Sequence, residues 1–290
     1  MNSPAISITP TMPASGDSSI GGILLASGKI TPENAERVLR MQKELGIRFG
    51  EAAQRLGLIT EADIQQVLAR QFDYPYLQAG EKQYSDRLLA AYQPFSPQVE
   101  KLRAVRSQLM LRWFARGRKA LTVVEVSPSD GAGIFTANLA VVFSQLGERT
   151  LLVDANLRAP SQLQTFDLQP RQGLSDILAG RADSSVVARI DNFVSLSLLA
   201  AGTVPPNPLE LLSRNTFVNL NAELESAYDV VLYNAAAFEL GSDALAVAAR
   251  TGGVLLVART NETQLADLHQ VIEEITHSGA EVVGAVMVDQ

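Results

Sequence analysis

The sequence predicts an α/β fold, with a mostly parallel sheet and flanking helices, preceded by a small all-α domain. After residue 120, apolar runs of strand length alternate with helical patterns, as parallel βαβ units require. A 29-residue repeat precedes this region, and the 47% apolar content of the 290 residues can form a sizeable core. The expected parts are a disordered tail (1–18), a helical tandem-repeat domain (19–78), a linker (79–96) and the α/β domain (97–290).

Composition narrows the classes of function. The net charge of −7 argues against a general nucleic-acid binder, which would normally be basic. The absence of cysteine excludes disulfides, thiol nucleophiles and cysteine zinc sites. We find no apolar run of about 18 to 20 residues and no signal-peptide pattern, so we expect a cytoplasmic protein without a transmembrane segment.

Six apolar runs are expected to form the sheet. They are Leu121–Val126, Thr150–Val153, Val194–Leu199, Val230–Tyr233, Gly253–Ala258 and Val282–Val288. Ligands of such sheets bind at the carboxyl ends of the strands. We therefore expect the segments Ser127–Gly133, Asp154–Arg158 and Asn234–Ala237 to lie together at one edge.

The first strand leads into a glycine loop and a helix within Val123–Ala140. Strand, glycine loop and helix form the frame of a P-loop, in which backbone N–H groups hold phosphate. The predicted fold is therefore P-loop NTPase-like. The motif G-x-x-x-x-G-K-[ST] also needs a lysine, and this loop has none. Gly131, Ala132 and Gly133 remain as weak nucleotide-binding candidates through their backbone amides.

Residues 19–78 match themselves after a shift of 29 residues. Ile20-Gly21 falls on Phe49-Gly50, and Thr31 falls on Thr60. Each copy predicts a short helix closed by glycine, followed by a longer helix that begins at the threonine. Two copies are too few for a solenoid, so a compact helical module is expected.

A helix is expected to precede the first strand. Its apolar stripe is expected to consist of Val99, Leu102, Val105, Leu109 and Trp113. Glu100, Arg103 and Arg106 lie along a neighbouring face at helical spacing. Two interpretations remain open: a solvated face of a helix that packs on the sheet, or a helix for self-association or docking.

Residues 97–290 resemble the bacterial tyrosine kinases (BY-kinases) of capsule and exopolysaccharide systems. The matching segments are Glu100-x-x-Arg103-x-x-Arg106, Asn138-Leu139-Ala140, Gly147-Glu148-Arg149, Gly173-Leu174-Ser175-Asp176 and Ala201–Leu212. Together with the repeat domain, the arrangement resembles the EpsG type, which is found with chain-length-determinant proteins. The resemblance implies a P-loop kinase domain that transfers phosphate from MgATP to tyrosine.

The lysine and the hydroxyl of the family's P-loop are both absent. Counting back from Asn138, the lysine position holds Ala132 and the Ser/Thr position holds Gly133. Counting from the glycines instead places Ile134 and Phe135 there, which restores neither group.

The carboxylate motifs are also depleted. The family's Asp-x-Asp-x-Arg keeps Asp154 and Arg158, and its second aspartate is Asn156. The aspartate after the fourth expected strand is Asn234, and Val288 replaces the asparagine expected near the adenine. Asp154 and Arg158 are therefore vestigial catalytic candidates, and Asp154 is the one vestigial metal ligand. No cofactor is predicted, because ATP and Mg²⁺ are the family's ligands and their binding groups are lost.

Residues 19–78 resemble the MshEN-like N-terminal domain of type II secretion ATPases, which in some members binds cyclic di-GMP. The family's Arg-Leu-Gly is matched by Arg48-Phe49-Gly50 in the second copy, whereas the first copy has Ser19 in place of the arginine. Arg48 and Gly50 are the cyclic di-GMP candidates, because arginine pairs with phosphate and stacks on guanine. The alternative is a protein-docking module.

Three hypotheses of function follow. The first is a pseudokinase that acts as a docking or regulatory subunit in exopolysaccharide biosynthesis and chain-length control. Its partner would be a membrane chain-length-determinant protein or a kinase paralogue. Homo- or hetero-oligomers would form through Glu100, Arg103 and Arg106. The partner would hold the protein at the inner membrane. The second is an active or weakly active tyrosine kinase. The third is a cyclic di-GMP-responsive receptor acting through residues 19–78.

Overall fold

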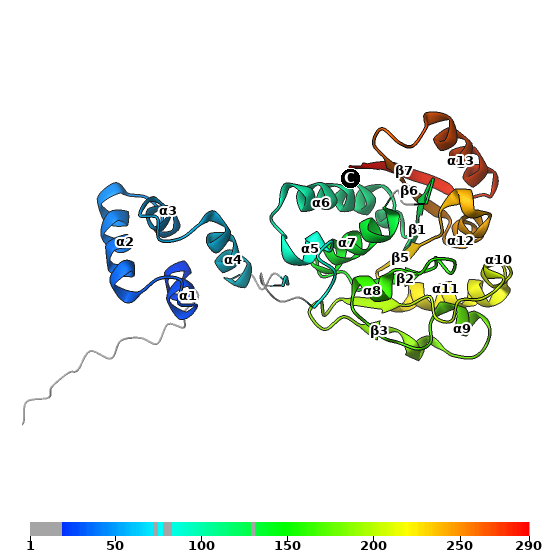
Figure 1. Ribbon diagram of the computed structural model, residues 1–290, viewed down its shortest axis with the longest axis horizontal. Coiled ribbons are helices and arrows are strands. Elements are labelled where there is room, and N and C mark those ends of the chain that lie inside the picture. The colour runs from blue at the N-terminus through cyan, green and yellow to red at the C-terminus, as the bar shows by residue number, and fades with distance from the viewer. Residues whose placement is uncertain (1–18, 72–74, 78–82, 129–130, 290) are drawn as a thin grey trace, which may run out of the picture. The chain divides into compact units, whose positions relative to one another are not determined.

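The chain divides into two compact units, Met1–Tyr74 and Pro75–Gln290. The computed structural model describes residues 19–71, 75–77, 83–128 and 131–289 (Figure 1). The expected disordered tail, residues 1–18, lies outside the described residues.

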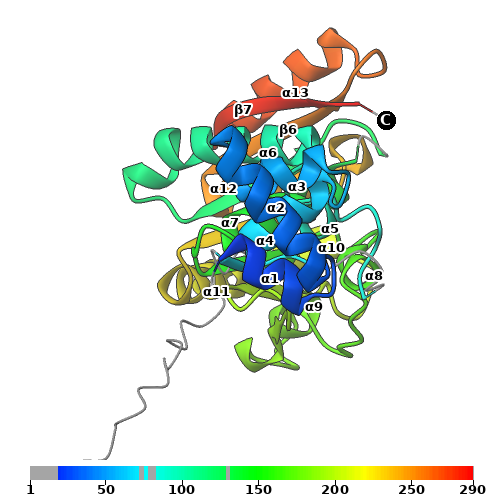
Figure 2. The ribbon, with the colours of Figure 1, turned by 90° about the vertical axis from the view of Figure 1, so that its left-hand side faces the viewer.

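The first unit is a bundle of helices (Figure 2), which form two successive pairs in the order of the chain. They are α1 (Ile20–Ala26), α2 (Pro32–Leu45), α3 (Phe49–Arg55) and α4 (Glu61–Gln71). The 29-residue repeat has a structural basis, because Gly28 and Gly57 close the first helix of each pair with φ of 70° and 67°. Both pairs contribute to one apolar core, which includes Leu24, Val38 and Val67.

The second unit is a seven-stranded sheet with helices on both faces. Its strands are β1 (Ala120–Glu125), β2 (Thr150–Asp154), β3 (Ala188–Arg189), β4 (Leu196–Leu199), β5 (Val230–Asn234), β6 (Gly253–Arg259) and β7 (Glu281–Val288). The order is β3-β4-β2-β5-β1-β6-β7. All neighbouring pairs are parallel except β3 with β4. The predicted fold class is confirmed.

The helices of this unit are α5 (Leu89–Tyr92), α6 (Pro97–Arg112), α7 (Ala132–Ser144), α8 (Gln162–Thr165), α9 (Leu174–Leu178), α10 (Pro208–Leu212), α11 (Asn215–Ala227), α12 (Asp243–Thr251) and α13 (Leu265–His277), with 3₁₀ turns at Phe114–Arg116, Ser184–Val186 and Phe238–Leu240.

Alternate strand residues divide between two apolar layers, as the pleat requires. Leu121 and Leu232 pack in the layer of α5, α6 and α7, whereas Val231 and Leu256 face the opposite layer. Figure 1 shows α7 on one side of the sheet and α12 with α13 on the other.

Some boundaries differ from the expected ones. Val194, expected to begin a strand, lies before β4 and is 94% exposed. The two-residue strand β3 has no signal in the sequence. Within the segment expected as a linker, residues 83–96 carry α5, and Leu88 and Ala91 are fully buried in the core of the second unit. Among the described residues, no helix combines the length and apolar character needed to cross a membrane.

Candidate functional site

Three strands bring the motif loops to one edge of the sheet. β5 lies between β2 and β1, and Asn234 at its end pairs in register with Asp154 on one side and Val123 on the other. The carboxyl ends of the three strands are therefore adjacent. Gly131–Gly133, the Asp154–Arg158 segment and the residues after Asn234 meet here. Residues 129–130 of the expected segment Ser127–Gly133 lie outside the described residues.

The start of α7 is capped by a carboxylate from the chain itself. Gly131 takes the left-handed conformation there, with φ of 89°, and has no side chain with which to cap the helix. Glu125, the last residue of β1, accepts hydrogen bonds through Oε2 from the amides of Gly131 (3.1 Å) and Ala132 (3.2 Å). Sequence reasoning missed Glu125. The available signal was an acidic residue at the end of a buried strand, directly before the glycine loop.

Asp154 is fully buried and bound by three donors. Its Oδ2 accepts from the amides of Ser161 (2.9 Å) and Gln162 (3.0 Å), and its Oδ1 accepts from Nδ2 of Asn234 (3.1 Å). Burial raises the pKa of this carboxyl, and these three donors together with the backbone amide of Asn156 oppose that rise. Both carboxylate oxygens are thus engaged within the protein.

The space beside Gly133 is filled. A Cβ added at Gly133 would lie 2.9 Å from Oγ of Ser161 and 3.5 Å from Nε2 of Gln162. Gln162 is fully buried and donates through Nε2 to the carbonyl of Gly133 (3.0 Å). A hydroxyl-bearing side chain at position 133 would therefore displace Ser161.

Arg158 forms an ion pair with Asp243 across the edge of the sheet. Its Nε and Nη2 lie 2.6 Å and 3.1 Å from the two oxygens of Asp243, the first residue of α12. Asp243 is 2% exposed, so the arginine balances a buried charge.

The other two altered motif positions are Asn156 and Val288. Asn156 accepts a hydrogen bond from the amide of Ala159 (3.0 Å) and so stabilises the turn that follows β2. Val288 lies close to the start of α7, because a Cβ added at Gly131 would be 4.0 Å from its side chain.

The most distinctive family motif, Ala201–Leu212, is held in place by hydrogen bonds to Asp176. Asp176 accepts from the amides of Gly173 and Thr203, both at 3.1 Å, and from the hydroxyl of Thr203. A Cβ at Gly173 would lie 2.1 Å from the carbonyl oxygen of Ala200, so glycine is required at this close approach. The motif shapes the backbone here.

Arg103 and Arg106 of α6 bind carbonyl groups of their own unit. Arg106 donates through Nη1 to the carbonyl of Val142 (2.6 Å), and Arg103 donates to that of Pro94. Arg103 also pairs with Glu100 (3.0 Å), whose side chain is 71% exposed. Of the predicted apolar stripe, Val99, Leu109 and Trp113 are buried. Leu102 and Val105 are half-buried and pack against the same core.

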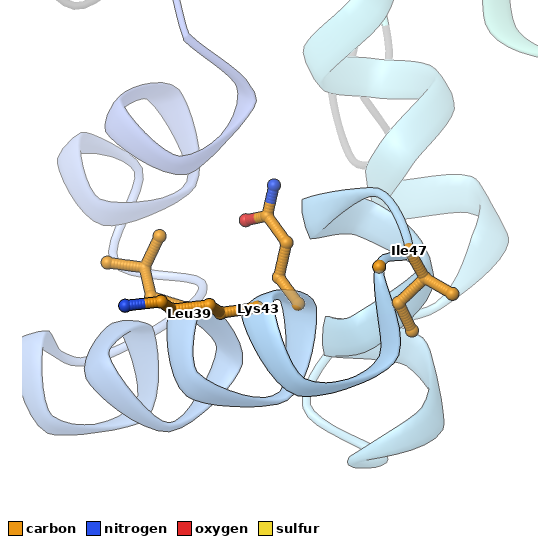
Figure 3. Close-up of a pocket in the computed structure, with 5 residues that line it drawn as sticks. Leu39, Lys43 and Ile47 are labelled. Atoms are coloured by element: carbon orange, nitrogen blue, oxygen red, sulfur yellow. The ribbon is translucent and has the colours of Figure 1, made fainter.

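In the first unit, Arg48 is exposed at the start of α3 and Gly50 is buried. A Cβ at Gly50 would lie 3.0 Å from Cδ1 of Ile64, so helix packing accounts for this glycine. Next to Arg48 along the chain is a hollow of about 590 Å³ (Figure 3). It is lined by Leu39, Gln42, Lys43, Gly46 and Ile47.

The described part of the chain contains no group of three His, Asp or Glu residues arranged to hold a metal ion. Ala132 and Gly133 lack the lysine and hydroxyl of the P-loop motif, and Asp154 is bound by internal donors. The residues at this edge therefore do not fit MgATP in the family's manner.

Comparison with known proteins places the chain in a family. No family model matches the sequence. The tyrosine-protein kinase YwqD of Bacillus subtilis is 30% identical over 200 residues, which are 69% of this chain and 84% of that protein. The chain belongs to the bacterial tyrosine-protein kinase family.

Other bacterial tyrosine kinases match a similar share of the chain. The tyrosine-protein kinase wzc of Salmonella typhimurium is 32% identical over 209 residues, 72% of this chain, but the chain spans only 29% of that protein's length. The kinase domain of Escherichia coli tyrosine kinase ETK superposes with a TM-score of 0.69 at 26% identity, covering 76% of this chain and 86% of that domain.

Proposed function

We propose that this member of the tyrosine kinase family is a pseudokinase, which acts as a docking or regulatory subunit in exopolysaccharide biosynthesis and chain-length control. One observation carries the proposal: Ala132 occupies the lysine position, while Asp154, the vestigial metal ligand, is bound on both oxygens by donors of the same chain. Its partner would be a membrane chain-length-determinant protein or a kinase paralogue.

The magnitude of the loss supports this proposal over an active kinase. A hydrogen bond to a charged group contributes about 1.5 to 3 kcal/mol. Loss of the lysine, the hydroxyl and two carboxylates removes ~5 kcal/mol or more of MgATP binding and transition-state stabilisation. That corresponds to a more than about thousandfold loss of affinity or rate. The hydrogen bonds of Asp176 and the apolar layers on both faces of the sheet are present. A docking domain needs this folded framework and does not need the lost charged groups.

The test is thermal unfolding of the full chain with and without MgATP. A ligand bound to the native state at about 100 times its Kd stabilises it by about 2.7 kcal/mol, which raises the midpoint by roughly 5 to 10 °C for a domain of this size. We expect no shift at 1 mM MgATP (about the upper end of typical substrate KM values) and no phosphotyrosine on a peptide substrate. A clear shift or phosphotransfer would overturn the proposal in favour of the active kinase.

Oligomer formation through α6 is part of the proposal. Arg103 and Arg106 bind carbonyls of their own unit, so replacing them would also disturb folding. Glu100 is the better probe because its side chain is 71% exposed. We expect Glu100→Lys to lower the sedimentation coefficient of the full chain, and an unchanged coefficient would remove α6 from the interface. Gln108→Lys, at another exposed position of α6, is the control.

A cyclic di-GMP receptor is the second candidate. It is favoured by the exposed Arg48, which follows the hollow that Lys43 and Ile47 help to line. Calorimetry with cyclic di-GMP should show binding that Arg48→Ala abolishes. Arg55→Ala is the matched control, since Arg55 pairs with Glu51 (2.8 Å) on the same helix. Absence of heat with the unaltered chain would discard this candidate.

A further inference from the structure

Glu125 occupies the backbone donors that a P-loop offers to phosphate. Its Oε2 accepts from the amides of Gly131 and Ala132, at the start of the 13-residue helix α7. Helix N-termini favour anions because their first N–H groups have no partner in the helix and the dipole is positive there. In this chain the anion is a carboxylate attached to the end of β1.

A tethered anion differs from an added one in its effective concentration. An attached group reaches its site at an effective concentration of the order of millimolar or more, without losing translational freedom. A phosphate that approached α7 would have to displace the Glu125 carboxylate and would be repelled by its charge. Both effects weaken anion binding at Gly131 and Ala132, whatever the fate of the lysine.

We propose that Glu125 is an autoinhibitory contact, a built-in competitor that keeps the phosphate cradle at the start of α7 closed to anions. The inference rests on the proposed function, because it concerns the same loop, and it adds a cause that is independent of the missing lysine. Glu125 is half-buried, and both of its hydrogen bonds to the amides of the helix start are part-buried.

The neighbouring acidic residue provides a matched control. Glu239 accepts a hydrogen bond from Oγ of Ser127 (2.6 Å) and lies at the same edge of the sheet. Among the described contacts of Glu239, none is with the amides of Gly131 or Ala132. Glu239→Gln removes the same charge from the same region and leaves the cap of α7 in place.

The experiment titrates the full chain with inorganic tripolyphosphate and with metal-free ATP in a calorimeter. The variants are Glu125→Ala, Glu125→Gln and Glu239→Gln, each checked for folding by its thermal midpoint. We expect at least ~10-fold tighter binding of both anions by Glu125→Ala, because the tethered competitor is removed. Glu125→Gln should gain less, since its amide oxygen still accepts from the same N–H groups, and Glu239→Gln should stay within about twofold of the unaltered chain on general charge grounds.

Each outcome decides the matter. No gain in Glu125→Ala, or an equal gain in Glu239→Gln, overturns the inference and leaves the proposed pseudokinase standing. If Glu125→Ala were poorly folded, Glu125→Gln would decide by the sign of its change. Tight MgATP binding by the unaltered chain would instead overturn the proposed function, and this result is distinguishable because it requires no variant.

Discussion

Two helices at the carboxyl edge of the sheet, α7 and α8, begin on carboxylates supplied by the strands before them. Glu125 at the end of β1 serves α7, and Asp154 at the end of β2 serves α8. Glu125 is half-buried, whereas Asp154 is fully buried. In both cases a carboxylate at the end of a strand accepts hydrogen bonds from amides at the start of the next helix, and the two carboxylates differ in burial.

The difference in burial separates a structural carboxylate from an exchangeable one. A buried charge with three donors cannot leave without exposing those donors to an apolar interior. Removing a half-buried carboxylate leaves donors that lie closer to water, so the expected loss of stability is smaller. Asp154 is therefore expected to determine stability, while Glu125 determines which anions reach α7.

The largest expected effect is that of Asp154→Ala. The change leaves Asn234 Nδ2 and the amides of Ser161 and Gln162 without an acceptor, and each unsatisfied donor costs about 1 to 3 kcal/mol. We expect a loss of about 3 to 5 kcal/mol and a fall of roughly 10 °C or more in the thermal midpoint.

A surface aspartate provides the control for this prediction. Asp183 accepts from the amide of Ser185 (2.9 Å) at the start of an exposed turn. Asp183→Ala should unfold near the temperature of the unaltered chain. A midpoint of Asp154→Ala within about 2 °C of that value, less than the shift for 1 kcal/mol, would show that the buried carboxylate is not the structural member of the pair.

The second effect concerns the space between α7 and α8. In an open helix, glycine to alanine stabilises by up to about 1 kcal/mol. At Gly133 the new Cβ would lie 2.9 Å from Oγ of Ser161, so we expect Gly133→Ala to destabilise by about 1 kcal/mol instead.

A double-mutant cycle with Ser161→Ala isolates this contact. The combined variant should recover most of the loss from Gly133→Ala, because the crowding hydroxyl is gone. Urea unfolding of the four proteins measures the coupling. Additive effects, or a stabilising Gly133→Ala, would mean that the two helix starts are not crowded together.

Sequence patterns predict the sheet well because its strands are apolar runs bounded by turns. The adjacency of Asp154 and Asn234 follows from two parallel strands ending side by side. The strand β3 escapes prediction because two residues, Ala188 and Arg189, carry no alternation.

The partners of the site residues are harder to predict. Comparison with a family motif shows which groups are missing, such as the lysine at Ala132, and does not point to a new partner such as Glu125. The donors to Asp154 from α8 are backbone amides, which have no sequence signal. The partner of Arg158, Asp243, lies 85 residues away in the chain, and only the tertiary fold joins them.

The smallest effect is expected at a third helix start, where a carboxylate that accepts hydrogen bonds also forms an ion pair with a lysine. At α4, Asp63 accepts from the amide (2.9 Å) and hydroxyl (2.7 Å) of Thr60, and it also pairs with Lys29 at 2.7 Å. The lysine and then the Thr60 amide lower the pKa of Asp63 from 3.8 to about 2. Burial acts in the opposite direction on Asp154.

Because the folded pKa of Asp63 is depressed, its contribution to stability is present above about pH 4 and is lost as the pH falls toward 2. A carboxyl-detected NMR titration should place its midpoint near 2. Lys29→Met should raise that midpoint part of the way to 3.8, since the Thr60 donors remain, and Asp63→Asn should flatten the acid loss of amide protection in α4. A midpoint unmoved by Lys29→Met would show that the donors at the helix start alone lower the pKa of Asp63. The ion pair with Lys29 would then not distinguish Asp63 from Glu125 and Asp154.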